Sequence, residues 1–130
     1  MKVTKICPVY TFTVMVPYVF ELDSNIAFDK LTSRREVERA DLKKKVSVIG
    51  EKVAPDGVGV EVSNVYFSGK LFDERVRYRA MLKIEFSWSY QNEKRKITEM
   101  TDFVIGQVVE TFDADFVVVD RDKQRYLYSR

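Results

Sequence analysis

Between Arg75 and Tyr90 the sequence alternates polar and apolar residues without interruption, and no other feature restricts the fold as strongly. Every second residue is apolar: Val76, Tyr78, Ala80, Leu82, Ile84, Phe86, Trp88 and Tyr90. A period of two is typical of a β-strand with one buried and one wet side. A straight strand over 75–91 would extend about 50 Å, whereas most strands extend about 17–20 Å. We therefore expect a bent or bulged strand, or one that projects beyond its own domain.

The composition is that of one folded domain over residues 1–130. Hydrophobic residues make up 45% of the chain and charged residues 32%, which argues against both disorder and a membrane-embedded chain. The most apolar run, from Pro8 to Phe20, is too short to span a bilayer and lacks a secretory cleavage site. These observations predict a cytoplasmic protein.

A second alternation, from Tyr10 to Leu22, predicts a first strand. Pro17 lies inside it and marks an edge or a bulge, because proline cannot donate a ladder hydrogen bond. A helix is predicted over 34–45, with Ser33 and Glu36 at capping-box spacing. Arg35 and Arg39, four residues apart, are interpreted as part of its solvated surface.

The remaining segments are interpreted as strands. Two runs rich in valine, at 46–53 and 58–71, surround Pro55-Asp56-Gly57 and predict a hairpin. A slip of parity between Val62 and Val65 indicates a bulge in its second arm. Further strands are expected at 96–109, at 116–119 (buried on both faces) and at 125–129. The sequence thus predicts an α+β protein: a strongly curved antiparallel β-sheet or partly closed barrel of six to seven strands, with one helix inserted after the first strand.

Little in the sequence indicates catalysis. The chain has no histidine and a single cysteine, Cys7, so the usual general base and the commonest zinc ligand are missing. Asp113, Asp115, Asp120 and Asp122 do not have the spacing of a calcium loop, and turns explain them better. We expect no catalytic residue, no cofactor and no metal site.

The polar side of the long strand carries a basic stripe, Arg75, Arg77, Arg79 and Lys83. Cations two residues apart can follow phosphates, so a nucleic-acid-binding module is one alternative function. However, the net charge is only +2, and the aromatic residues have the opposite parity. Ion pairs with acidic residues of neighbouring strands are a simpler explanation for the stripe.

The aromatic residues of the long strand suggest association. Tyr78, Trp88 and Tyr90 fall on its apolar side, and tyrosine and tryptophan are enriched at protein interfaces. The main functional prediction is therefore a non-enzymatic structural or interaction protein. It would act through self-association as a homo-oligomer, or as a component of a larger assembly such as a viral or cellular particle. A small-molecule-binding sheet cavity is a further alternative.

Overall fold

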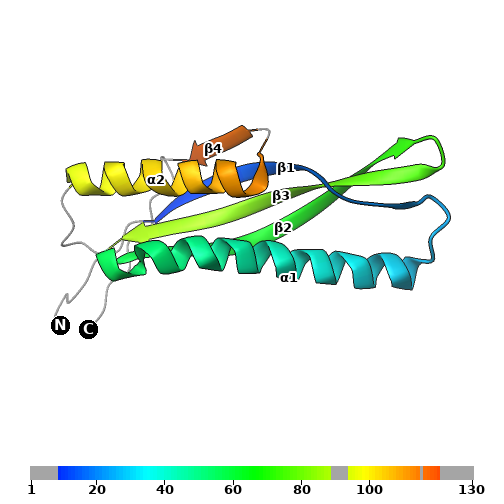
Figure 1. Cartoon of the computed structure of the whole chain (residues 1–130), viewed down its shortest axis with the longest axis horizontal. Helices are drawn as coiled ribbons and strands as arrows, with labels where there is room; N and C mark the ends of the chain where they lie inside the picture. Colours follow the sequence, from blue (N-terminus) through cyan, green and yellow to red (C-terminus); the bar gives the residue numbers. More distant parts are fainter. Residues whose placement is uncertain (1–8, 89–93, 115, 121–130) are drawn as a thin grey trace.

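The protein is described by a computed structural model over residues 9–88, 94–114 and 116–120. Its elements follow the order β1 (Val9–Asp23), α1 (Phe28–Val53), a short 3-10 helix (Ala54–Asp56), β2 (Val58–Phe72), β3 (Arg75–Trp88), α2 (Lys94–Phe112) and β4 (Phe116–Asp120). The strands form one antiparallel sheet in the order β2-β3-β1-β4 (Figure 1). This βαββαβ arrangement, with β3 between β1 and β2, is the ferredoxin-like fold.

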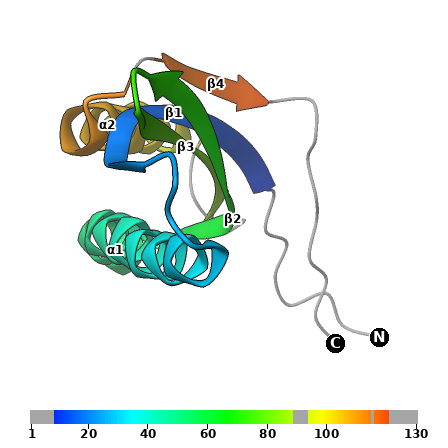
Figure 2. The same ribbon diagram turned by 90° about the vertical axis from the view of Figure 1, so that its right-hand side faces the viewer.

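Both helices lie on the same side of the sheet (Figure 2). The opposite side, which we call the open face, has no helix over it within the described residues. Figure 1 shows that α2 lies over one end of the sheet only. The β2–β3 hairpin and the end of β1 extend beyond α2, and there only α1 runs alongside them. None of the described helices is both long enough and apolar enough to cross a membrane.

The predicted alternation of the long strand is confirmed in β3, where Tyr78, Leu82 and Phe86 are buried. Both expected bulges are present as well. The register of β1 against β3 shifts between Val16 and Phe20, and that of β2 shifts between Val62 and Asn64. The extra residues lie in β1 and β2, which flank β3, whereas the sequence had suggested a bend or bulge in the long strand itself.

The predicted fold class is wrong in its strand number and in its helices. The described residues form four strands in an open sheet with two helices, whereas we expected six to seven strands in a curved sheet or partial barrel with one helix. Segments 46–53 and 96–109 are helical. The strand expected at 116–119 is β4, which lies at the sheet edge and is not buried on both faces, since Val118 is exposed. The strand expected at 125–129 lies outside the described residues.

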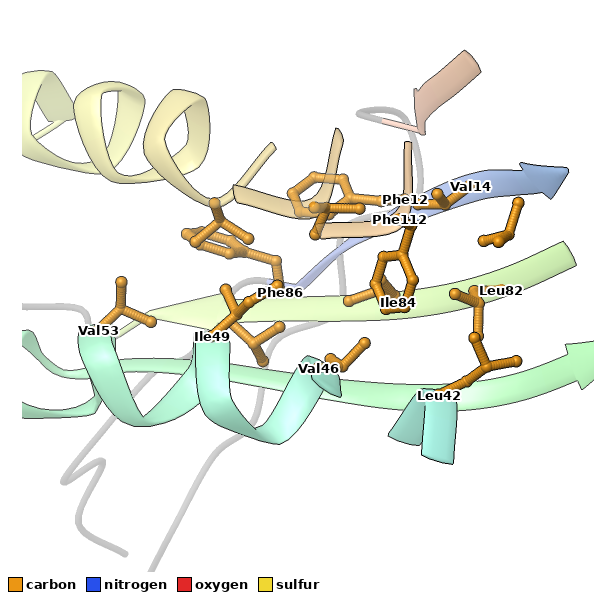
Figure 3. Packing of buried hydrophobic residues seen from close by; sticks show 14 of the residues in the cluster. Phe12, Val14, Leu42, Val46, Ile49, Val53, Leu82, Ile84, Phe86 and Phe112 are labelled. Carbon is orange, nitrogen blue, oxygen red and sulfur yellow. The ribbon is translucent and has the colours of Figure 1, made fainter. Parts of the chain in front are cut away.

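Side-chain packing explains why the valine-rich segment 46–53 is helical. Leu42, Val46, Ile49 and Val53 follow one another at intervals of four and three residues and are all buried against the sheet (Figure 3). A helical period that fills the core outweighs the strand preference of β-branched residues, which is a weak tendency. The predicted turn at Pro55–Gly57 is present, but it connects a helix to a strand, with Gly57 in the left-handed region at φ 79°.

The second helix was missed for a similar reason. Met100, Val104, Val108 and Phe112 are four residues apart and form the buried side of α2. The strand expected at 96–109 was read from an alternation that included Phe103 and Val109, and both are exposed. Together with β1 and β3, the two helices enclose a core that includes Phe12, Ile84 and Phe86 (Figure 3).

Candidate functional site: an arginine–tyrosine cluster on the open face

The distal end of the sheet, which extends beyond α2, consists of 18–23 in β1, 67–72 in β2 and 75–79 in β3. Its strands pair so that side chains on the open face form rows across the sheet. The rows are Phe72–Arg75–Asp23, Lys70–Arg77–Glu21 and Ser68–Arg79. Four cations therefore face two carboxylates in these rows, and the excess of positive charge favours an anionic ligand.

Glu21 links two of the arginines. Arg75 Nε and Arg77 Nε each donate to a different oxygen of the Glu21 carboxylate, the second at 3.0 Å. Arg75 also donates to Asp23 Oδ1 at 3.1 Å. The hydrogen bond from Arg75, followed by that from Arg77, lowers the pKa of Glu21. The cross-strand ion pairs expected as the simpler explanation of the basic stripe are thus present for Arg75 and Arg77.

Tyr18 has an unusual backbone conformation for an aromatic residue. It lies in the β1 bulge with φ 47°, in the left-handed region that bulky side chains seldom adopt. Its side chain is 49% exposed. Such strain persists only where surrounding contacts hold it, and it is concentrated at functional sites.

Two guanidinium groups lie over the Tyr18 ring. The Arg79 Cζ is 5.0 Å from the ring centroid and the Arg77 Cζ is 5.4 Å from it. Arg79 Nη2 also donates to the Tyr18 hydroxyl oxygen at 3.4 Å. This hydrogen bond and the positive charges of both arginines lower the pKa of the Tyr18 phenol. On its other side Arg77 lies 4.5 Å from the ring centroid of Phe72, so two rings and one carboxylate hold its guanidinium in place.

We call Tyr18, Glu21, Phe72, Arg75, Arg77 and Arg79 the arginine–tyrosine cluster. Guanidinium groups bind carboxylates and phosphates through paired N–H donors, and stacking on rings fixes the direction of those donors. A phenol beside them can donate a further hydrogen bond to the same anion. Within the described residues, no group of three acidic or cysteine side chains is placed to hold a metal ion.

The structure separates the predicted site residues. Arg75, Arg77 and Arg79 come together in the cluster, whereas Lys83 lies further along β3, with its Nζ 5.7 Å from the ring centroid of Tyr66. The predicted interface residues that the structure describes do not lie together. Tyr78 is buried on the helix side, Trp88 is buried at the other end of β3, and Tyr90 lies outside the described residues. Their part in an interface remains a prediction.

Sequence reasoning missed Tyr18, Glu21 and Phe72 as members of a site. Tyr18 has the same parity as Phe12 in the alternation that predicts the first strand, and a regular strand would place both on one side. The bulge beside Pro17 turns Tyr18 to the open face. Pro17 was therefore the available signal, since a bulge redirects the side chains within it.

Comparison with protein-family models gives no match, and comparison with curated proteins gives none either. Solved structures do resemble this one. An amidase of the hydantoinase/carbamoylase family from Burkholderia phymatum is 13% identical, with a TM-score of 0.52. The match covers 97% of this chain and 31% of the amidase chain. A hydantoinase/carbamoylase family amidase from Burkholderia ambifaria is 7% identical, with a TM-score of 0.50. The match covers 95% of this chain and 29% of the amidase chain.

A tripeptidase from Staphylococcus aureus is 10% identical, with a TM-score of 0.45. The match covers 97% of this chain and 31% of the tripeptidase chain. That score is too low to support an argument. The chain thus spans about three-tenths of the length of these proteins. At such identities the likeness establishes the fold alone.

These comparisons contradict the main functional prediction. We expected a non-enzymatic structural protein that acts through self-association, with a nucleic-acid-binding module or a sheet cavity as alternatives. Two of the solved structures that share this fold over nearly the whole chain are amidases, which are enzymes. The predicted partners, a second copy of the chain or a nucleic acid, remain predictions.

Proposed function

We propose that this chain forms a domain of an amide-hydrolysing enzyme and binds the carboxylate of an amide substrate on its open face. The observation that carries the proposal is the pair of guanidinium groups over the half-exposed ring of Tyr18, a residue whose backbone lies in the left-handed region. The fold that the chain shares with two amidases supports the link to amide hydrolysis.

The geometry suits a carboxylate because one of the guanidinium groups that would bind it is already held in a fixed position. Arg77 is held by Glu21 and by the rings of Tyr18 and Phe72. Ordering a long flexible side chain costs free energy when a ligand binds, and a side chain that is already ordered avoids most of that cost. Arg79 and the Tyr18 hydroxyl would then supply further donors to the same anion.

The proposal is tested by titrating the full chain with three small compounds and following binding by NMR. N-acetylglycine carries an amide and a carboxylate, N-acetylglycinamide lacks the carboxylate, and butyrate lacks the amide. We expect saturable binding of N-acetylglycine, weaker binding of butyrate, and none of the neutral amide. Equal binding of N-acetylglycine and N-acetylglycinamide would show that no carboxylate is recognised, and equal binding of butyrate would remove the link to amides.

A double variant locates the site. Arg77→Gln with Arg79→Gln removes both guanidinium groups, and we expect binding to weaken about tenfold or more, because hydrogen bonds to charged groups contribute about 1.5–3 kcal/mol. Lys83→Gln removes a cation from the same strand outside the cluster and serves as the matched control. If the two proteins bind N-acetylglycine equally well, the cluster is not the site.

A further inference from the structure

A cleft of about 610 Å³ lies at the tip of the distal end, beside the cluster. It is formed where β1 ends, where the β2–β3 hairpin turns, and where α1 begins. The backbone N–H of Ser24 donates to the carbonyl of Glu74 at 2.9 Å, which ties the loop after β1 to the hairpin turn. This volume is within the range of small-molecule sites, about 300–1,000 Å³.

The lining of the cleft combines both signs of charge with apolar surface. It includes Leu22, Asp23, Ile26, Lys30, Glu74 and Arg75. Asp23 and Arg75 pair with each other at 3.1 Å, so their charges are largely compensated. Lys30, from α1, and Glu74, from the hairpin turn, have no ion pair with any residue in the described part of the chain.

The absence of a Lys30–Glu74 pair within that part of the chain has a geometric meaning. Their charged atoms are more than 4.0 Å apart, although both residues line the same cleft. A cationic residue and an anionic residue from two different elements therefore border a common space. Leu22 and Ile26 add apolar surface to that space.

We propose that this cleft binds a small zwitterion, a free amino acid or a dipeptide. Glu74 accepts hydrogen bonds from the ligand ammonium group, Lys30 donates to the ligand carboxylate, and the ligand side chain packs on Leu22 and Ile26. A zwitterion satisfies both protein charges at once, whereas a simple anion or cation leaves one of them without a partner. The inference does not rest on the proposed function, because it concerns different side chains.

The test uses one dipeptide in three forms, titrated by calorimetry into the full chain and into its variant with Arg77→Gln and Arg79→Gln. The values in the variant decide the outcome, because binding of a carboxylate at the cluster is removed there. Ala-Leu carries both charges, N-acetyl-Ala-Leu lacks the ammonium group, and Ala-Leu amide lacks the carboxylate. We expect Ala-Leu to bind about tenfold more tightly than either blocked form, in line with one charge-assisted hydrogen bond. If a blocked form binds as tightly as Ala-Leu, or if none binds, the proposal is overturned.

Two variants link each ligand group to its protein partner. Glu74→Gln should weaken the binding of Ala-Leu about tenfold and leave the binding of N-acetyl-Ala-Leu unchanged. Lys30→Gln should weaken the binding of Ala-Leu to the same extent and leave the binding of Ala-Leu amide unchanged. Asp73→Asn and Lys44→Gln change one charge on the same turn and on the same helix, outside the lining, and serve as controls. Equal losses in variants and controls would mean that only the overall field matters, which contradicts a built site.

The cleft and the cluster fail independently. The double variant Arg77→Gln with Arg79→Gln should keep its affinity for Ala-Leu while losing N-acetylglycine. Loss of both ligands in that variant would mean that the two proposals describe one site, and it would overturn the cleft as a separate one.

Discussion

Under α2, apolar side chains pack on one another to form the core. On the helix side of the distal end, three rings are instead covered by guanidinium groups. Phe12, Ile84 and Phe86 represent the first arrangement and are fully buried. In the second, Phe20, Phe67 and Tyr78 each have an arginine of α1 over the ring, at 5.4–5.6 Å from the centroid. The length of the helices explains the difference, because α2 ends before the distal end and only α1 covers it.

Arginine can replace a second helix because its long stem covers apolar surface. Arginine side chains of α1 therefore cover the rings of the distal end on the helix side. On the open face the same residue type meets Tyr18 and Phe72. One end of the molecule is thus built for stability, and the other presents charge to solvent, which is the arrangement that a binding site requires.

The largest effect is expected in the apolar core. Phe86→Ala removes a ring with no exposed surface and should lower the free energy of unfolding by about 3–5 kcal/mol. Chemical denaturation measures this loss. A loss below about 1 kcal/mol would mean that α2 and α1 do not close on β3 as described.

A smaller loss is expected at the distal end. Tyr78→Leu removes a ring that stacks on Phe20 at 4.6 Å and lies under Arg35, and it should cost about 1–2 kcal/mol. Tyr66→Leu, at an exposed position on β2, is the control and should cost well under 1 kcal/mol. If Tyr78→Leu destabilises as much as Phe86→Ala, the two ends do not differ in the way proposed.

The smallest effect is a spectroscopic one. Because Arg79 donates to its oxygen, Tyr18 should ionise below the ordinary value of 10.0. A pKa that is lower in the folded state means that stability rises as pH increases through it, and the gain is complete above the unfolded value. Ultraviolet titration of phenolate should lose one step below pH 10.0 in Tyr18→Phe and show that step at higher pH in Arg79→Gln. An unchanged curve in both variants would exclude the contact.

The sequence predicted well those features that depend on neighbours in one strand. The facing of β3, both bulges and the turn at Pro55–Gly57 follow from local patterns. Helical segments 46–53 and 96–109 were misassigned because valine favours strands locally, while their burial against the sheet depends on residues far along the chain. The sequence singled out the three arginines of the cluster because they share one strand. Tyr18 and Glu21 join them only through the pairing of β1 with β3.

The bulge in β1 also determines which changes of length the strand can accept. Three residues, 17–19, stand opposite Arg79 alone, and beyond them Phe20 returns to the helix side and Glu21 to the open face. Removing one of the three would exchange the two faces for the rest of the strand. Phe20 would then face water, and the carboxylate of Glu21 would be carried beneath the arginines of α1, away from Arg75 and Arg77. Substitutions at 17 and 19 should therefore be tolerated far better in evolution than a single deletion there.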